Sequence, residues 1–282
     1  MPSDVLIVTN GYKGTWSAIE QGAWLAGTLD SSITLLGVTE VLNPAAIDDH
    51  HPLEEVFERA VGLFNEQGVA YKLEVQKGSA EEILPKRVAQ DESVVVLSPL
   101  GRTQFRRMIS GRSIRHFIEE LKQPILYVPE SKLPVQRILI CVGGLGYEVN
   151  AEHLAMQIGL KSRAEITLLH IVPPGDLDYP TARTIRDNWQ RLEQTETPVG
   201  RSLRKALEIA KADGLIATVK GRQGNVVEEI LAETRDGKYD LVCMGSSYSV
   251  HSLRQMYSTN VTSEIFDGVH CPVLTARYTK TP

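Results

Sequence analysis

The chain has 282 residues, 42% of them hydrophobic and 23% charged, and its 30 basic and 35 acidic side chains give a net charge of −5. This composition excludes a disordered, collagen-like or coiled-coil chain, and the acidic balance argues against nucleic acid as a partner. The sequence has no apolar run of the roughly 18–20 residues that span a bilayer, no secretory signal, and three cysteines without a C-x-x-C pair, so we expect a cytoplasmic protein with no membrane partner.

Short apolar runs rich in β-branched residues alternate with stretches of helical periodicity along the chain. The runs predict strands at 5–8, 33–38, 94–98, 125–128, 137–142, 166–171, 241–245 and 273–276. Helical spacing or helix-start signals occur at 16–28, 81–84, 114–121 and 152–160. Because the strand runs do not alternate with polar residues, they predict strands buried on both faces, as in a parallel sheet covered by helices.

The chain also repeats itself. Segments 33–38, 78–84, 94–98 and 123–126 resemble, in the same order, segments 166–171, 224–231, 241–245 and 271–274. The pattern predicts a tandem duplication in which the second copy carries about 15 extra residues, mostly between Pro173 and Pro198. We therefore predict an α/β protein of two tandem, doubly wound, five-stranded parallel-sheet domains, residues 1–130 and 131–282, joined by the connector 129–134.

In such sheets ligands bind at the carboxyl ends of the strands. In the first copy this edge carries Asn10 and Gly11 after the first strand and the loop from Ser98 after the fourth. Five arginines and no acid lie between positions 102 and 115, although residues 1–130 together carry a charge of −6. Glycines that let the backbone approach a ligand, beside a local basic cluster, favour a phosphate group.

The loop after each fourth strand has a characteristic spacing. The first copy reads Ser98-x2-Gly101-x9-Gly111-Arg112-Ser113, and the second reads Gly245-x2-Tyr248-x9-Ser258-Thr259. With the duplication, these segments make the chain resemble the tandem universal stress proteins, whose nucleotide-binding members carry G-x2-G-x9-G-[S/T] there and an aspartate after the first strand. The resemblance implies the adenine nucleotide alpha hydrolase-like fold and pairing of the two copies within one chain through their fifth strands, with pairing between chains as the alternative.

The resemblance also implies a stress-response binding module that holds ATP or another adenine nucleotide. In the first copy the implied binding residues are Asn10, Val38, Leu97, Ser98, Gly101, Gly111, Arg112 and Ser113. Asn10 stands where the family has aspartate, which removes the charge but keeps a hydrogen-bonding side chain. In the second copy Gly143 has no side chain to contact a ligand, and Tyr248 places a ring where the backbone would meet phosphate, so this site is predicted to be degenerate.

Other interpretations remain open. The arginine cluster also fits a solvated loop, and the whole chain also fits a scaffold of the same fold that binds no nucleotide. An ATP-hydrolysing enzyme is a third hypothesis, but no general base or metal carboxylate is recognised near Gly101 or Gly111, so we predict no catalytic residue and no metal. The run Asp48–His51 is interpreted as a helix cap rather than a metal site, and Trp16 and Trp24 as core residues on one helical face.

Overall fold

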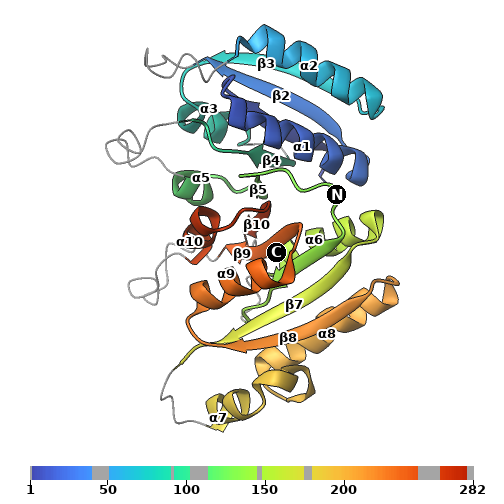
Figure 1. The fold of residues 1–282 in the computed structure, drawn as a ribbon, viewed down its shortest axis with the longest axis vertical. Helices are drawn as coiled ribbons and strands as arrows, with labels where there is room; N and C mark the ends of the chain where they lie inside the picture. Colours follow the sequence, from blue (N-terminus) through green and yellow to red (C-terminus); the bar gives the residue numbers. More distant parts are fainter. Residues whose placement is uncertain are drawn as a thin grey trace. The chain divides into compact units, whose positions relative to one another are not determined.

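The computed structural model describes residues 2–39, 51–89, 92–101, 114–144, 148–174, 180–246 and 261–277, with the backbone alone at 115, 116 and 246. The chain divides into two compact units: residues 1–133 form the first, with which 270–272 are grouped, and the rest of the chain from Pro134 forms the second. In each unit a twisted sheet is flanked by helices (Figure 1).

The first unit alternates strands with helices, as predicted. Its strands are β1 (Asp4–Thr9), β2 (Ser32–Thr39), β3 (Tyr71–Lys77), β4 (Ser93–Leu97) and β5 (Ile125–Tyr127). Its helices are the 3-10 turn η1 (Lys13–Thr15), α1 (Trp16–Leu29), α2 (Leu53–Glu66), α3 (Ala80–Arg87) and α5 (Ile114–Glu120). The strands are parallel in the order β3-β2-β1-β4-β5.

The central strand β1 explains the unbroken apolar runs. Ile7 of β1 lies opposite Leu35 of β2 and Val96 of β4, and all three side chains are fully buried. The chain proceeds from β1 to β2 and β3 on one side and returns to β4 and β5 on the other. Right-handed crossovers therefore place α1 and α2 on one face and α3 and α5 on the opposite face, consistent with the contacts of α1 with α2 and of α3 with α5.

The second unit repeats this plan. Its strands are β6 (Arg137–Cys141), β7 (Glu165–Val172), β8 (Ala217–Gln223), β9 (Leu241–Ser246) and β10 (Val273–Arg277), parallel in the order β10-β9-β6-β7-β8. Its helices are α6 (Val149–Ser162), α7 (Pro180–Asp187), the 3-10 helix η3 (Trp189–Gln194), α8 (Pro198–Ala212), α9 (Val226–Gly237) and α10 (Val261–Gly268). The extra residues predicted after Pro173 contain α7 and η3.

The register of the second unit matches the first. Ile140 of β6 lies between Leu168 of β7 and Cys243 of β9, as Ile7 does between its two partners. Local signals fix the helix starts: the Asn225 side chain accepts hydrogen bonds from the backbone N–H groups of residues 227 and 228 at the start of α9, and Thr197 caps α8 in the same way. The predicted two-copy α/β fold is therefore confirmed.

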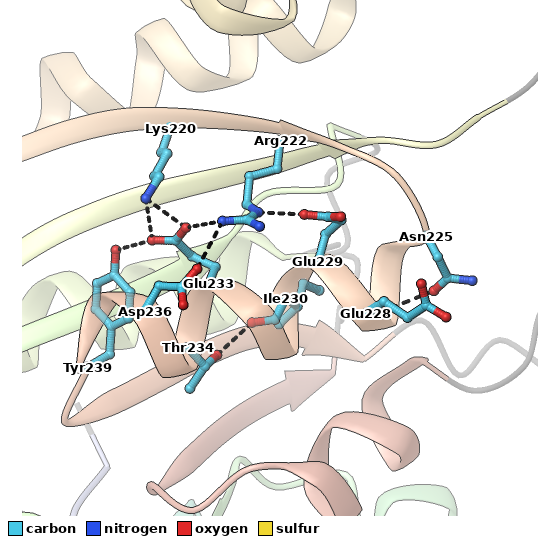
Figure 2. A network of polar contacts seen from close by, with 10 residues as sticks. All are labelled: Lys220, Arg222, Asn225, Glu228, Glu229, Ile230, Glu233, Thr234, Asp236 and Tyr239. Carbon is cyan, nitrogen blue, oxygen red and sulfur yellow. Dashed lines mark hydrogen bonds and ion pairs between the residues drawn. The ribbon is translucent and has the colours of Figure 1, made fainter.

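A buried ionic network joins the edge strand β8 to α9 (Figure 2). The carboxylate of Glu233 is fully buried and lies 2.7 Å from the Nζ of Lys220 and 3.1 Å from the Nη1 of Arg222. The hydroxyl of Tyr239 donates to the same carboxylate at 2.9 Å. Burial acts to raise the pKa of Glu233, but the hydrogen bonds from Lys220 and Tyr239 outweigh it and hold the pKa below its ordinary value.

The first unit has a related link at its own edge strand. Arg87 of α3 donates two hydrogen bonds of 2.9 Å to the carboxylate of Glu74 on β3. The hydrogen bonds from Arg87 lower the pKa of Glu74. In both units, then, an ion pair joins the edge strand to the helix that precedes the fourth strand. The predicted ligand loop follows that fourth strand.

Candidate functional site

The sheet order identifies where a ligand site would form. In the first unit β1 and β4 are neighbours, and the chain leaves β1 toward β2 but leaves β4 toward β5. Connections that diverge in this way open a crevice at the carboxyl ends of the two strands. Asn10 follows β1 and Ser98 follows β4, so the topology brings together two of the predicted site residues.

The side chain of Asn10 bridges the two loops at this edge. Its Nδ2 donates to the carbonyl oxygen of Leu100 at 3.1 Å, and its Oδ1 accepts from the backbone N–H of Tyr12 at 3.1 Å. Asn10 is 7% exposed. The amide keeps one further hydrogen and one further lone pair for a ligand, so its first role is to hold the loops after β1 and β4 together.

Ser98 stands where the family resemblance places the first glycine. Its hydroxyl is buried and has no hydrogen-bond partner in the described part of the chain. The hydroxyl of Ser93, at the opposite end of β4, is also buried and also has no partner among the residues described. Ser98 differs from Ser93 in lying at the carboxyl edge of the sheet. An unpaired buried hydroxyl costs about 1–3 kcal/mol, which a ligand hydrogen bond would recover.

Two of the predicted residues reach this edge only through their backbones. The side chains of Val38 and Leu97 are core residues with at most 1% exposure. The carbonyl oxygen of Leu97 already accepts a hydrogen bond of 2.7 Å from the backbone N–H of Val128. A role for these side chains as direct ligand contacts is therefore not supported by their burial.

The ring of Tyr12 lies against Gly101. Gly101 has a φ of +67°, and a Cβ built on it would lie 2.4 Å from the Cδ2 of Tyr12 and 2.5 Å from its Cγ. A Cβ on Gly14 would lie 2.6 Å from the Cε1 of the same ring. The ring thus occupies the space that the absent side chains of both glycines leave, a contact that no local sequence pattern indicates.

The remaining predicted residues, Gly111, Arg112 and Ser113, lie outside the described residues, as do the arginines at 102, 106 and 107. The same is true of Tyr248, Ser258 and Thr259 in the second unit, and the roles of all these residues stay predictions. Asp48 and Asp49 also lie outside the described residues, but α2, the helix that their run was expected to cap, begins at Leu53 with Pro52 as its N-cap, so the predicted cap is wrong.

The second unit builds the equivalent edge with different chemistry. The backbone N–H of Gly144, two residues beyond Val142, donates to the Oε1 of Glu148 at 2.9 Å, and Glu148 is only 4% exposed. The second carboxylate oxygen of Glu148 lies 3.8 Å from a Cβ built on Gly143. Gly143 itself has no side chain, but Glu148 brings a buried carboxylate to this edge, which was not predicted.

Two further titratable groups lie near this carboxylate. Burial, and then the charge of Glu148, raise the pKa of Glu152 to about 7, with Lys205 acting in the opposite direction. Burial lowers the pKa of His170, whose Nδ1 donates to the carbonyl oxygen of Val142 at 2.6 Å. Gly144 and Glu148 lie four residues apart at the start of α6, and this local spacing could have predicted the acidic edge from the sequence. The contact of His170 with Val142 could not be predicted in this way, because it depends on the pairing of β7 with β6.

Other chemical groups give no further site. No cluster of three or more histidine, cysteine, aspartate or glutamate side chains that could hold a metal occurs among the described residues. The three cysteines form no disulfide, and burial raises the pKa of the Cys141 thiol to about 12, which makes it a poor nucleophile. No helix in the described ranges is long and apolar enough to cross a membrane.

Comparisons with known proteins agree with this architecture. The sequence model of the Universal stress protein family matches residues 134–277, just over half of the chain. The match covers the second unit, so membership of the first unit rests on its fold and stays a prediction at the sequence level. No curated protein is significantly similar to the chain in sequence.

Solved structures resemble the chain over nearly its whole length. They include a universal stress protein from Archaeoglobus fulgidus DSM 4304, with 16% identity, a TM-score of 0.70 and coverage of 98% of this chain and 97% of that chain. A functionally unknown protein from Pseudomonas aeruginosa PAO1 has 10% identity, a TM-score of 0.61 and coverage of 98% and 92%. The cytoplasmic domain of a prokaryotic cation chloride cotransporter has 13% identity, a TM-score of 0.53 and coverage of 98% and 96%. At these identities the likeness shows the two-domain fold alone.

Proposed function

Because the chain belongs to the universal stress protein family, we propose that it is a stress-response binding module whose first unit holds an adenine nucleotide such as ATP. The site lies at the carboxyl ends of β1 and β4. The observation that carries the proposal is the buried hydroxyl of Ser98, which has no hydrogen-bond partner among the described residues and lies where the connections diverge. A nucleotide oxygen or hydroxyl that bonded to Ser98 would remove the cost of leaving it unpaired.

Charge and backbone conformation support phosphate as part of the ligand. Gly101, three residues after Ser98, has the positive φ that turns backbone N–H groups toward an anion in many phosphate loops. The proposal gives Arg112 and Ser113, together with Gly111, the task of holding the phosphates. Asn10 contributes its remaining amide hydrogen or lone pair, and Val38 and Leu97 contribute backbone groups.

The second unit fits this role less well. The carboxylate of Glu148 already accepts from the backbone N–H of Gly144, which is one of the donors that an anion would need. A second carboxylate, Glu152, adds to the negative character of the edge when it is ionised. We therefore expect one nucleotide per chain, bound by the first unit.

Two serines of β4 provide the test. Ser98→Ala removes the hydroxyl at the carboxyl edge, whereas Ser93→Ala removes a buried hydroxyl at the other end of the strand that likewise has no partner within the described ranges. Calorimetric titration with ATP should show one site in the parent, affinity reduced about fivefold in Ser98→Ala by the loss of one hydrogen bond, and parent affinity in Ser93→Ala. Native mass spectrometry of freshly purified protein would show a co-purified nucleotide directly. Equal affinities of the two variants would remove Ser98 from the site.

A scaffold without a nucleotide is the second candidate. The bridge from Asn10 to Leu100 and the contact of Tyr12 with Gly101 close the loops on each other. The likeness to the cytoplasmic domain of a cotransporter is consistent with a fold that also serves inside larger assemblies. Under this alternative, parent and variants all fail to bind ATP.

A further inference from the structure

The side chain of Tyr12 lies between two glycines, one in the turn η1 after β1 and one in the loop after β4. Gly14 approaches one edge of the ring, near Cε1 and Cδ1, and Gly101 approaches the other edge, near Cδ2, Cγ and Cε2. Gly14 follows β1 and Gly101 follows β4, so the ring spans the two loops at the carboxyl edge of the first unit. A methyl group on either glycine would overlap the ring unless the ring moved, because real Cβ atoms do not approach other atoms within 3.0 Å.

This position conflicts with an approaching phosphate. A glycine in a phosphate loop leaves its Cα surface bare so that the ligand can come within van der Waals distance of the backbone. At Gly101 the ring already occupies that bare surface. Ring and ligand cannot share it, since two non-bonded heavy atoms need about 3.5 Å between them.

We propose that Tyr12 is an internal occupant of the ligand-facing surface of Gly101, and that its ring has to swing away before a nucleotide phosphate can bind. The inference rests on the proposed function of this site. It assigns to Tyr12 the control of nucleotide affinity in the first unit.

The backbone around Tyr12 is fixed, so the movement is confined to the side chain. The N–H of Tyr12 donates to Asn10, and its carbonyl oxygen accepts from both the backbone N–H and the hydroxyl of Thr15, at 2.8 and 2.7 Å. The hydroxyl of Thr15 also lies 2.7 Å from that of Thr9 at the end of β1. The Tyr12 side chain itself is half-buried, and rotation about χ1 moves the ring without breaking these backbone hydrogen bonds.

An occupant of this kind lowers the apparent affinity in proportion to the time it spends in place. If the surface is open for only a fraction of the time, the apparent Kd is the intrinsic Kd divided by that fraction. A ring that is in place about nine-tenths of the time weakens binding about tenfold. Removal of the ring should restore the intrinsic affinity.

The test compares Tyr12→Ala with Tyr12→Phe. Titration of ATP into the full chain should give Tyr12→Ala at least about fivefold tighter binding than the parent. Tyr12→Phe keeps the ring and should bind as the parent does. In the parent, the ring resonances of Tyr12, assigned by their loss in Tyr12→Phe, should shift on addition of ATP.

The outcomes separate this inference from the proposed function. If the parent binds ATP clearly and Tyr12→Ala binds it equally or more weakly, the proposed role of Tyr12 is overturned and the proposed nucleotide site stands. Binding by Tyr12→Ala alone supports the occupant and shows that the parent site is closed. Absence of binding in every variant overturns both proposals. If Tyr12→Ala fails to fold, an unchanged Tyr12 ring signal in the parent at saturating ATP overturns the occupant by itself.

Discussion

The carboxylate of Glu233 on α9 lies 2.7 Å from the ammonium group of Lys220 on β8, and it has no exposed surface of its own. Lys220 is nearly half exposed, so this pair joins a buried anion to a partly hydrated cation. The pair between Arg204 and Glu196 has a similar length of 2.9 Å, but Glu196 is 82% exposed. Burial, rather than distance, should therefore decide what each pair contributes to stability.

Glu233→Gln should destabilise the second unit. The substitution removes the counter-charge of Lys220 and leaves a buried amide beside it, while Arg222 keeps its ion pair with Glu229 at 2.6 Å. The loss should lower the free energy of unfolding by about 2–3 kcal/mol. The matched control, Glu196→Gln, should change it by less than about 0.5 kcal/mol. Urea unfolding at pH 7 measures both. A similar small effect of the two substitutions would mean that the network is as hydrated as a surface pair.

The same carboxylate should make the second unit sensitive to acid. Because its pKa is lowered in the folded chain, Glu233 contributes stability above its ordinary pKa of 4.5, and this contribution is lost as the pH falls through the lowered value. Unfolding measured from pH 6 to pH 3 should therefore be steeper in the parent than in Glu233→Gln. Parallel curves would show that the acid sensitivity comes from other groups.

Glu152 should act in the opposite direction. Its pKa of about 7 in the folded chain exceeds the ordinary value of 4.5, so the folded state keeps a proton that the unfolded state has lost. Stability from this group is therefore full below pH 4.5 and falls as the pH rises through 7, by up to about 3 kcal/mol. Glu152→Gln should abolish this fall in urea unfolding between pH 5 and pH 8.

Glu148→Gln provides a second variant for the same measurement. It removes the neighbouring charge but leaves Glu152 buried, so the fall in stability should move to lower pH rather than vanish. If Glu152→Gln leaves the pH profile as it is in the parent, the raised pKa is wrong.

Two glycines of the first unit should respond to alanine with opposite signs. Gly101→Ala should cost about 1–2 kcal/mol, because the residue has a positive φ and its Cβ would overlap the Tyr12 ring. Gly62 lies exposed within α2 with nothing near its Cβ position, so Gly62→Ala should stabilise the unit by about 0.5–1 kcal/mol. Thermal unfolding measures both changes.

A double variant tests the cause of the cost at Gly101. If the ring is responsible, Gly101→Ala should cost less in the Tyr12→Ala background, where only the backbone strain remains. Additive effects would place the ring away from Gly101.

Pairing of the copies through their fifth strands, β5 and β10, is still a prediction. Pairing within one chain predicts the mass of a single chain in light scattering, whereas pairing between chains predicts twice that mass. A mass that falls on dilution would favour pairing between chains.

The strands could be predicted because their cause is local. Runs such as Val5–Val8 are apolar on both faces, and the structure buries both faces of β1 as the runs require. Similar segments recur in the same order in the second half of the chain, so the same strands could be predicted there. The helices α7 and η3 were not predicted, because the insertion that contains them has no counterpart in the first copy.

The site was harder to predict because its contacts join distant residues. Tyr12 and Gly101 are far apart in the sequence, and nothing local indicates that one fills the space beside the other. Trp16 and Trp24 illustrate the same limit. Their shared helical face predicted core positions, but both are only half-buried. The guanidinium of Arg59 lies over the Trp16 ring at 3.7 Å from its centroid.

The ion pairs at the two edge strands affect which helix can pack on which strand while the duplicated chain folds. Glu74 and Lys220 each lie four residues before the glycine that follows their strand, Gly78 or Gly224, and Arg87 and Glu233 each lie nine residues after it. The two copies therefore use the same two positions with the charges reversed. If α3 and α9 changed places during folding, acid would face acid at one strand and base would face base at the other. Like-charge repulsion should therefore disfavour pairing of each strand with the other copy's helix, and so reduce misassembly between the two halves.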